Sequence, residues 1–335
     1  MHHQHASNPK RRRGARTVER PYAVERAQVE LRGRDFLAIR DLDVQEMRTV
    51  LAVAAELKQR GRHGDRPPLL AGKVLALVFA KPSLRTHVTF ETAMLHLGGH
   101  GIYLDSRSIG MGTRESYPDI ARNLERWVDG IAARTFAHAN VVALAAHARV
   151  PVINALSDWE HPCQALAALL TIEERFGRVG GVRIAWIGDG NNVLRSLVLG
   201  AVRLGASMAI ATPPGYELDA ETLRDARVCA ADGATVDVTD DPVWAVRDAD
   251  LVYTDVWTSM GQEAELEGRR RAFSRYQVNA ALLAHAPRHA VVSHCLPAHR
   301  GEEITDELLD GPRAVAFDEA ENRLHVQKSL LALAL

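Results

Sequence analysis

Short apolar runs alternate with amphipathic, helix-forming stretches along most of the chain. In the first half, aliphatic runs predict buried strands at 73–80, 100–104, 130–135 and 151–154. After Gly180-Gly181 the alternation restarts and predicts strands at 182–187, 207–212, 235–238, 250–254 and 290–293. Strands separated by helices pair in parallel through right-handed crossovers. The pattern therefore predicts an α/β fold with two doubly wound, mostly parallel-sheet domains joined by interdomain helices.

The amphipathic stretches predict helices that pack against these sheets. Asp43 and Glu46 have the spacing of a capping box, and an apolar face follows them from Met47 to Leu57. Further helices are expected at 118–128, 141–147, 166–176 and 319–335, with another ending at Leu204. A chain of 335 residues is long for one core, so we expect two domains, at 35–160 and 161–318.

Charge is uneven along the chain although the total is only −1. Residues 1–34 hold nine Lys or Arg against three Glu, a net +6, which leaves −7 for the remainder. We interpret 1–34 as a basic, disordered leader; contact with nucleic acid or a membrane surface is the alternative, and no function is assigned to it. Neither kind of partner is expected for the rest of the chain.

Composition indicates a cytoplasmic enzyme without a metal. No apolar run approaches the ~20 residues of a transmembrane helix, and the N-terminus lacks the apolar stretch of a secretory signal. Cys163, Cys229 and Cys295 form no CxxC pair and cannot make a disulfide framework. His2, His3 and His5 could bind a metal adventitiously, but no matching site is evident elsewhere.

The stretch 81–86, Lys-Pro-Ser-Leu-Arg-Thr, connects a predicted strand to a predicted helix. A helix that begins here presents unpaired N–H groups and the positive end of its dipole. Ser83, Arg85 and Thr86 add two hydroxyls and a guanidinium, which suits a phosphate group. A polar turn with a capping Ser or Thr is an equally good interpretation of these six residues alone.

Gly188-Asp189-Gly190 after a predicted strand suggests a dinucleotide site, but two features oppose it. The third glycine of that fingerprint would fall at Val193, and the next strand ends without an acidic residue for a ribose hydroxyl. Asn191 and Asn192 instead place carboxamides at a helix start, where they could bind an amino acid or, for one of them, cap the helix.

Three further stretches, 158–164, 255–261 and 294–300, combine with Ser83-Leu84-Arg85-Thr86 to give a specific set of motifs in one order. Together they resemble the aspartate/ornithine transcarbamoylase family from about Phe36 to the C-terminus. Asp255 with Ser259-Met260-Gly261 resembles the ornithine-specific members. The resemblance implies transfer of a carbamoyl group from carbamoyl phosphate to the side-chain amine of L-ornithine, giving L-citrulline and phosphate. It also implies that no metal or organic cofactor is used and that helix 319–335 returns to the first domain.

The resemblance also assigns residues. Carbamoyl phosphate would bind to Ser83, Leu84, Arg85, Thr86, Arg134, His161, Gln164, Cys295, Leu296 and Arg323. Ornithine would bind to Asn192, Asp255, Ser259 and Met260, with Asn191 as the alternative to Asn192. The chemistry would depend on Arg85, Arg134, His161, Gln164, Asp255 and Cys295. Putrescine, acetylornithine and aspartate remain alternative acceptors, and a noncatalytic carbamoyl phosphate binder is the alternative from another functional class.

The family pattern further implies a homotrimer with its sites at subunit interfaces, with higher assembly left open. Three positions depart from that pattern. Leu84 stands where a threonine is common, and His87 stands where a second arginine is usual. Gly110 replaces a glutamine that reaches a neighbouring subunit's phosphate, and Arg107 or Arg114 could take over that contact.

Overall fold

The computed structural model describes residues 31–231 and 233–335, so the predicted leader lies outside the described residues as far as residue 30. Residues 31–34 belong to the folded body: Leu31 is buried and the Gly33 N–H donates to the Ala334 carbonyl. No helix of the described residues is long and apolar enough to cross a membrane.

The first sheet has four parallel strands in the order β2-β1-β3-β4. Their bounds are β1 Val74–Phe79, β2 His100–Asp105, β3 Gly130–Arg134 and β4 Val152–Leu156. Alternate residues of β1 enter two different cores: Leu77 packs with helices α2 (Val44–Arg62) and α3 (Leu84–His96) on one face. Val78 packs with α5 (Tyr117–Leu124) and α6 (His138–His147) on the other. The sheet is therefore covered by helices on both faces, as continuous apolar parallel strands require.

The second sheet has five parallel strands in the order β7-β6-β5-β8-β9. Its strands are β5 Arg183–Ile187, β6 Ser207–Ala211, β7 Val236–Thr239, β8 Leu251–Thr254 and β9 Val291–His294. Its helices are α8 Asn192–Arg203, α9 Ala220–Cys229, α10 Pro242–Val246, α11 Leu266–Phe273, α12 Ala280–Leu283 and α13 Asp306–Leu309. The predicted α/β class with two parallel sheets is thus confirmed.

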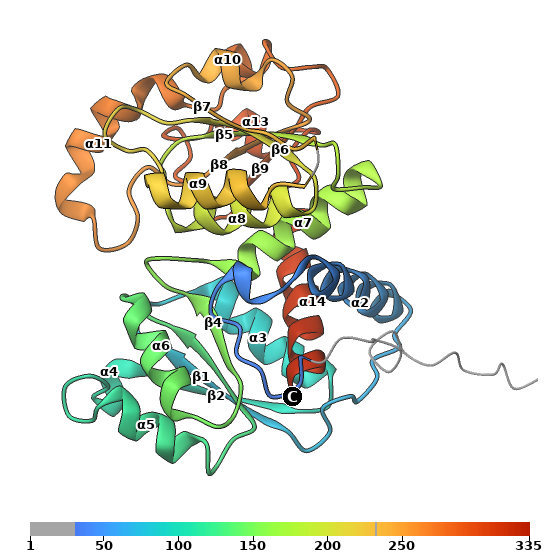
Figure 1. Cartoon of the computed structure of the whole chain (residues 1–335), viewed down its shortest axis with the longest axis vertical. Helices are drawn as coiled ribbons and strands as arrows, with labels where there is room; N and C mark the ends of the chain where they lie inside the picture. The colour runs from blue at the N-terminus through green and yellow to red at the C-terminus, as the bar shows by residue number, and fades with distance from the viewer. Residues whose placement is uncertain (1–30, 232) are drawn as a thin grey trace, which may run out of the picture.

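Two long helices connect the parts of the molecule that carry the sheets. Helix α7 (Pro162–Phe176) packs against α8, α2 and strand β4, and α14 (Ala316–Ala334) packs against α7, α2 and α3. Figure 1 shows α14 descending from the level of α7 to the lower body, where the C-terminus lies beside α3. Because α7 contacts elements of both parts, the boundary at residue 160 stays a prediction.

The predicted strands all form, with ends displaced by at most a few residues. The capping box at Asp43 and Glu46 is confirmed, since each side chain accepts from the other's backbone N–H. The helix predicted at 118–128 ends at Leu124, and the last helix begins at Ala316 rather than at residue 319. Helices α9 to α13 were not predicted.

Candidate active site

A cavity of about 830 Å³ lies where the carboxyl ends of strands from both sheets meet. The strands supply Arg134 from the end of β3, and Asp255 and Cys295 immediately after β8 and β9. This is the edge at which open parallel sheets place their ligands. Every predicted site residue except Thr86 lines the cavity: Ser83, Leu84, Arg85, Arg134, His161, Gln164, Asn192, Asp255, Ser259, Met260, Cys295, Leu296 and Arg323.

The 81–86 loop combines the two roles that its sequence left open. Ser83 caps α3, because its Oγ accepts from the Thr86 N–H at 3.2 Å. The same loop lines the cavity through Lys81 to Arg85. Thr86 lies behind the cavity wall, fully buried, and its hydroxyl accepts from the Arg323 guanidinium at 2.8 Å. Leu84 is 75% exposed, so its side chain makes few contacts within the chain.

Arg85, Arg134 and Arg323 bring three guanidinium groups to one end of the cavity. None of them forms an ion pair with a described carboxylate, and the Nε atoms of Arg134 and Arg323 are buried without a hydrogen-bond partner. Burial, with the charges of Arg323 and Arg85, lowers the pKa of Arg134 to about 9. Burial also lowers the pKa of Arg85 and of Arg323. Such a cluster is suited to an anion that accepts from several forked donors.

His161 and Gln164 face the same space from the start of α7. His161 is the N-cap residue, Pro162 occupies the first turn, and the His161 N–H donates to Ser196 Oγ at 2.9 Å. Burial and the three arginines lower the pKa of His161 well below its ordinary value, so the ring is neutral at neutral pH. His161 Nδ1 and Gln164 Oε1 are both buried without a partner. Two neutral polar groups are thus available to a ligand beside the cation cluster.

Glu319 is a buried residue of the site that sequence reasoning missed. Its carboxylate, 1% exposed, accepts from the Gln164 amide, the Tyr253 hydroxyl and, at 2.6 Å, the Ser293 hydroxyl. Burial raises its pKa to about 7, against these hydrogen bonds. The only sequence signal was an acidic residue one helical turn before Arg323.

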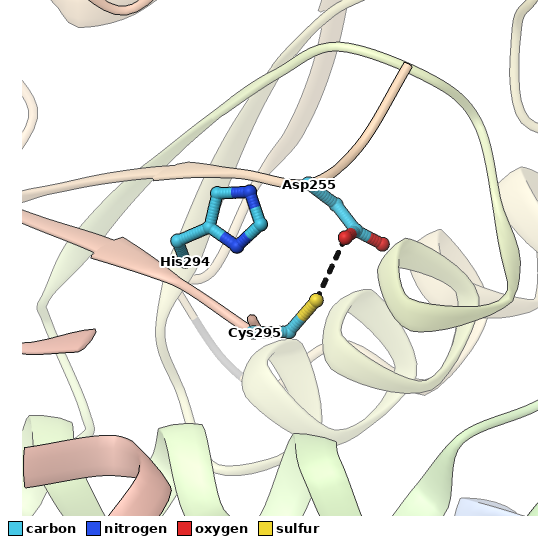
Figure 2. A group of neighbouring side chains, drawn as sticks. All are labelled: Asp255, His294 and Cys295. Carbon is cyan, nitrogen blue, oxygen red and sulfur yellow. Dashed lines mark hydrogen bonds between the residues drawn. The ribbon is translucent and has the colours of Figure 1, made fainter. Parts of the chain in front are cut away.

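Asp255 and Cys295 lie side by side in the cavity wall (Figure 2), near enough to Arg85 for their charges to act on it. The Cys295 thiol donates to Asp255 Oδ1 at 2.8 Å, and Asp255 Oδ2 accepts from Asn191 Nδ2 at 2.7 Å. Burial and the Asp255 charge raise the pKa of Cys295 well above its ordinary value. The sulfur is therefore a protonated thiol here and a weak nucleophile.

Asp255, His294 and Cys295 place one ligand atom each within 4.8 Å of one another, a donor set that could hold a metal such as zinc. Both nitrogens of the His294 ring are already engaged, with Glu303 at 3.1 Å and with the Leu296 N–H at 2.8 Å. The thiol is engaged as well, so a metal would have to replace these bonds.

Of the two adjacent asparagines, Asn191 is the helix cap and Asn192 lines the cavity. Asn191 caps α8 by accepting from the Val193 and Leu194 N–H groups, and it lines a neighbouring hollow of about 650 Å³. Asn192 lines both hollows, and its amide donates to the Ser157 carbonyl at 2.6 Å. Close packing explains why residue 190 is a glycine, because a Cβ there would lie 2.4 Å from the backbone of Glu217.

The departures from the family pattern lie on different surfaces. His87 stacks on Tyr103 with ring centroids 4.0 Å apart and does not line the cavity. Gly110 follows the short helix α4 (Ser106–Ile109) with a φ of 66°, and a Cβ there would lie 2.7 Å from the Arg114 Cβ. Among the described residues, none of 106–115 lines the cavity of its own chain.

Comparison with known proteins agrees with this geometry. The carbamoyl-P binding domain model of aspartate/ornithine carbamoyltransferase matches residues 34–174, and the Asp/Orn binding domain model matches residues 180–334. The ornithine carbamoyltransferase of Pyrococcus horikoshii is 51% identical over 308 residues, which cover 92% of this chain and 97% of that protein. The Pyrococcus furiosus ornithine carbamoyltransferase structure superposes with a TM-score of 0.89 at 50% identity, covering 91% and 98% of the two chains. The chain belongs to the aspartate/ornithine carbamoyltransferase family.

Proposed function

We propose that this chain is an ornithine carbamoyltransferase, which moves the carbamoyl group of carbamoyl phosphate to the side-chain amine of L-ornithine and releases L-citrulline and phosphate. The observation that carries the proposal is the cluster of Arg85, Arg134 and Arg323, in which Arg134 and Arg323 are buried, Arg85 is half-buried, and no described carboxylate forms an ion pair with any of the three. Unpaired buried charge is expensive, so a site of this kind is built for an anion.

Carbamoyl phosphate matches the groups on offer. Its phosphate takes the three guanidinium groups and the N–H groups at the start of α3, next to Ser83. Its carbonyl oxygen and its amide lie against His161 and Gln164, which have one donor or acceptor each to spare. Cys295 and Leu296 are consecutive residues of the cavity wall, and we place them between the two ligands.

The reaction is direct attack by the amine, because the Cys295 thiol is protonated and therefore a weak nucleophile. The neutral amine of ornithine forms the new C–N bond, the C–O bond breaks with its electron pair going to the departing phosphate, and the nitrogen passes one proton to that phosphate or to water. The site contributes position and charge stabilisation, both of which lower the barrier without a covalent intermediate. Activity should rise with pH as the ornithine ammonium loses its proton.

Ornithine is the acceptor that fits the part of the cavity around Asp255. Asp255 offers a buried carboxylate to the α-ammonium, and Asn192, Ser259 and Met260 lie around it. Putrescine lacks an amino-acid end for these groups. The test compares citrulline formation from ornithine with carbamoylation of acetylornithine, putrescine and aspartate at fixed carbamoyl phosphate. Ornithine should give the highest kcat/KM; a higher value for another acceptor refutes the assignment, and binding without turnover makes the chain a noncatalytic binder.

A homotrimer is the assembly that we infer from the family. The 106–115 loop does not line its own cavity, and the Arg107 side chain is 84% exposed and forms an ion pair with Asp105 at 3.3 Å. Arg107 and Arg114 could therefore reach a neighbour's phosphate. The test mixes an Arg85→Ala chain with a chain carrying Arg107→Ala and Arg114→Ala. Recovered activity in hybrids supports sites shared between subunits; a fully active loop variant refutes the role of both arginines.

A further inference from the structure

The carboxylate of Glu319 fixes the orientation of the Gln164 side chain. Gln164 Nε2 donates to Glu319 Oε1, and this leaves Gln164 Oε1 buried, without a partner and on the cavity wall. An amide side chain can be turned by 180° with little change in shape, so its hydrogen-bond partners decide which atom faces a ligand. Above its pKa of about 7, as at pH 8, the Glu319 carboxylate is ionised and only accepts hydrogen bonds, so the NH₂ group must face it.

Glu319 is itself held in place by the second sheet. Tyr253 on β8 and Ser293 on β9 are directly paired in the strand register, and both hydroxyls donate to the carboxylate. Tyr253 donates to the same oxygen as Gln164, whereas Ser293 donates to the other oxygen. All donors within reach thus point at the carboxylate, and the preferred direction of each bond is unambiguous.

The position of Glu319 on α14 links it to the phosphate end of the site. Glu319 and Arg323 are four residues apart and lie on one face of the helix. One turn of α14 thus carries both a guanidinium that faces the anion and a carboxylate that orients the neighbouring amide. Gln164, at the start of α7, donates to Glu319 and lines the same cavity as Arg323.

We propose that Glu319 is a positioning residue that makes Gln164 an obligate hydrogen-bond acceptor, and that it thereby selects a ligand with an NH₂ group next to the carbonyl over one with a methyl group. The inference rests on the proposed function, since the ligand is carbamoyl phosphate. With Glu319 in place, a carbamoyl NH₂ donates to Gln164 Oε1, whereas the methyl group of an acetyl compound leaves that buried oxygen unpaired. Sites built to hydrogen-bond a ligand reject analogues that lack the polar group.

The test uses two stable phosphonates that differ only at this position. Phosphonoacetamide carries the NH₂ group, and 2-oxopropylphosphonate carries a methyl group. Their dissociation constants, with that of inorganic phosphate, are measured by calorimetry on the whole chain at pH 8. The wild-type chain should prefer phosphonoacetamide by about tenfold or more. Gln164→Leu removes the acceptor and gives the lower limit of this preference: the ratio of the two phosphonates' dissociation constants should be near one.

Glu319→Leu should lower the ratio to that lower limit while the phosphate constant changes less than about threefold, because the loosened amide can present either end. Glu319→Gln should keep the ratio, since its carbonyl oxygen can accept from Gln164 and its amide can donate to Ser293. Ser293→Ala is the matched control: it removes a bond to the far oxygen of Glu319 and should leave the ratio unchanged. If Glu319→Leu fails to fold, Glu319→Asp withdraws the carboxylate by one carbon–carbon bond and should also lower the ratio.

Two results would overturn the inference. In one, the substitutions at Glu319 leave the preference for phosphonoacetamide intact. In the other, they weaken phosphate and both phosphonates by the same factor, as a purely structural role requires. A wild-type chain that binds none of the three ligands would instead refute the proposed function, so the two failures can be told apart.

Discussion

Replacing Arg134 by methionine should make the unliganded protein more stable and at the same time abolish its response to phosphate ligands. Arg134 ends β3, is 5% exposed, and has one long hydrogen bond, to Thr86 at 3.5 Å. No described carboxylate forms an ion pair with it, and the nearby charges that lower its pKa are those of Arg323 and Arg85. The positive charge of Arg134 therefore stays buried because the rest of the fold holds the side chain there, and no negatively charged partner stabilises it.

The magnitude follows from the pKa of Arg134. A pKa of about 9 in place of 12.5 means that burial and the neighbouring arginines oppose the charged form by about 5 kcal/mol. Because the pKa is lowered, this penalty is fully present below pH 9 and is relieved only as the pH rises from about 9 toward 12.5. Methionine keeps much of the volume without the charge. Replacing a buried ion pair by apolar groups of similar volume is often neutral or stabilises by about 1–4 kcal/mol, and we expect a gain in that range at pH 7.5 for this cation, which forms no ion pair with a described carboxylate.

The assay is urea unfolding in phosphate-free buffer, with and without saturating phosphonoacetamide. At 100 times its dissociation constant the ligand should stabilise the wild-type chain by about 2.7 kcal/mol and the Arg134→Met variant by almost nothing. Arg195→Met is the control, because Arg195 is equally buried but is paired with Asp219 at 2.6 Å and lies over the Trp159 ring. Its loss should destabilise by about 1–3 kcal/mol. If Arg134→Met destabilises the unliganded chain as Arg195→Met does, Arg134 is a structural cation and the reasoning is wrong.

Three further predictions concern single side chains. Arg85→Ala should fold normally and lower kcat/KM at least about 100-fold through loss of a charge-assisted contact. Unchanged steady-state kinetics would show that the 81–86 loop is only a turn and does not bind phosphate. Cys295→Ala should slow the reaction without eliminating it. In the wild-type chain, mass spectrometry should find no carbamoyl adduct on Cys295, and a trapped adduct would refute direct attack. The raised pKa of Glu319 means that wild-type stability falls between about pH 4.5 and 7, by up to about 3 kcal/mol. Glu319→Gln should lose this component in unfolding curves at pH 5 and 8, and an identical pH slope in both proteins would contradict it.

The two sheets and most of the cavity could be predicted because both depend on local patterns. Apolar runs with intervening helices specify parallel strands, and the carboxyl ends of such strands converge. Arg134, Asp255 and Cys295 each follow or end such a run, so their meeting is a property of the topology. The short helices of the second half were missed because α10, α12 and α13 span only four or five residues, too few for a periodic pattern.

Other features depend on which side of an element a residue faces, and no local pattern carries that information. Asn191 and Asn192 are adjacent and chemically identical, but one caps α8 and contacts Asp255 whereas the other reaches the Ser157 carbonyl. Glu319 appeared to be an ordinary acidic residue in the first turn of a helix. Its role became visible only once α14 lay against β8 and β9.

Helix α14 explains how a site with three guanidinium groups that form no ion pair with a described carboxylate can persist in a folded chain. Arg323 reaches Thr86, which belongs to the first sheet's loop, while Glu319 on the previous turn is bonded to strands of the second sheet. Asn322 between them accepts from buried Lys58 of α2 at 2.6 Å and donates to Thr171 of α7 at 2.9 Å. The remaining turns bury leucines in the main core. The helix is thus fixed at several points outside the anion site, and the stabilisation from these contacts offsets the repulsion inside it. Because both sheets contribute to those contacts, neither half of the chain could present the complete site alone.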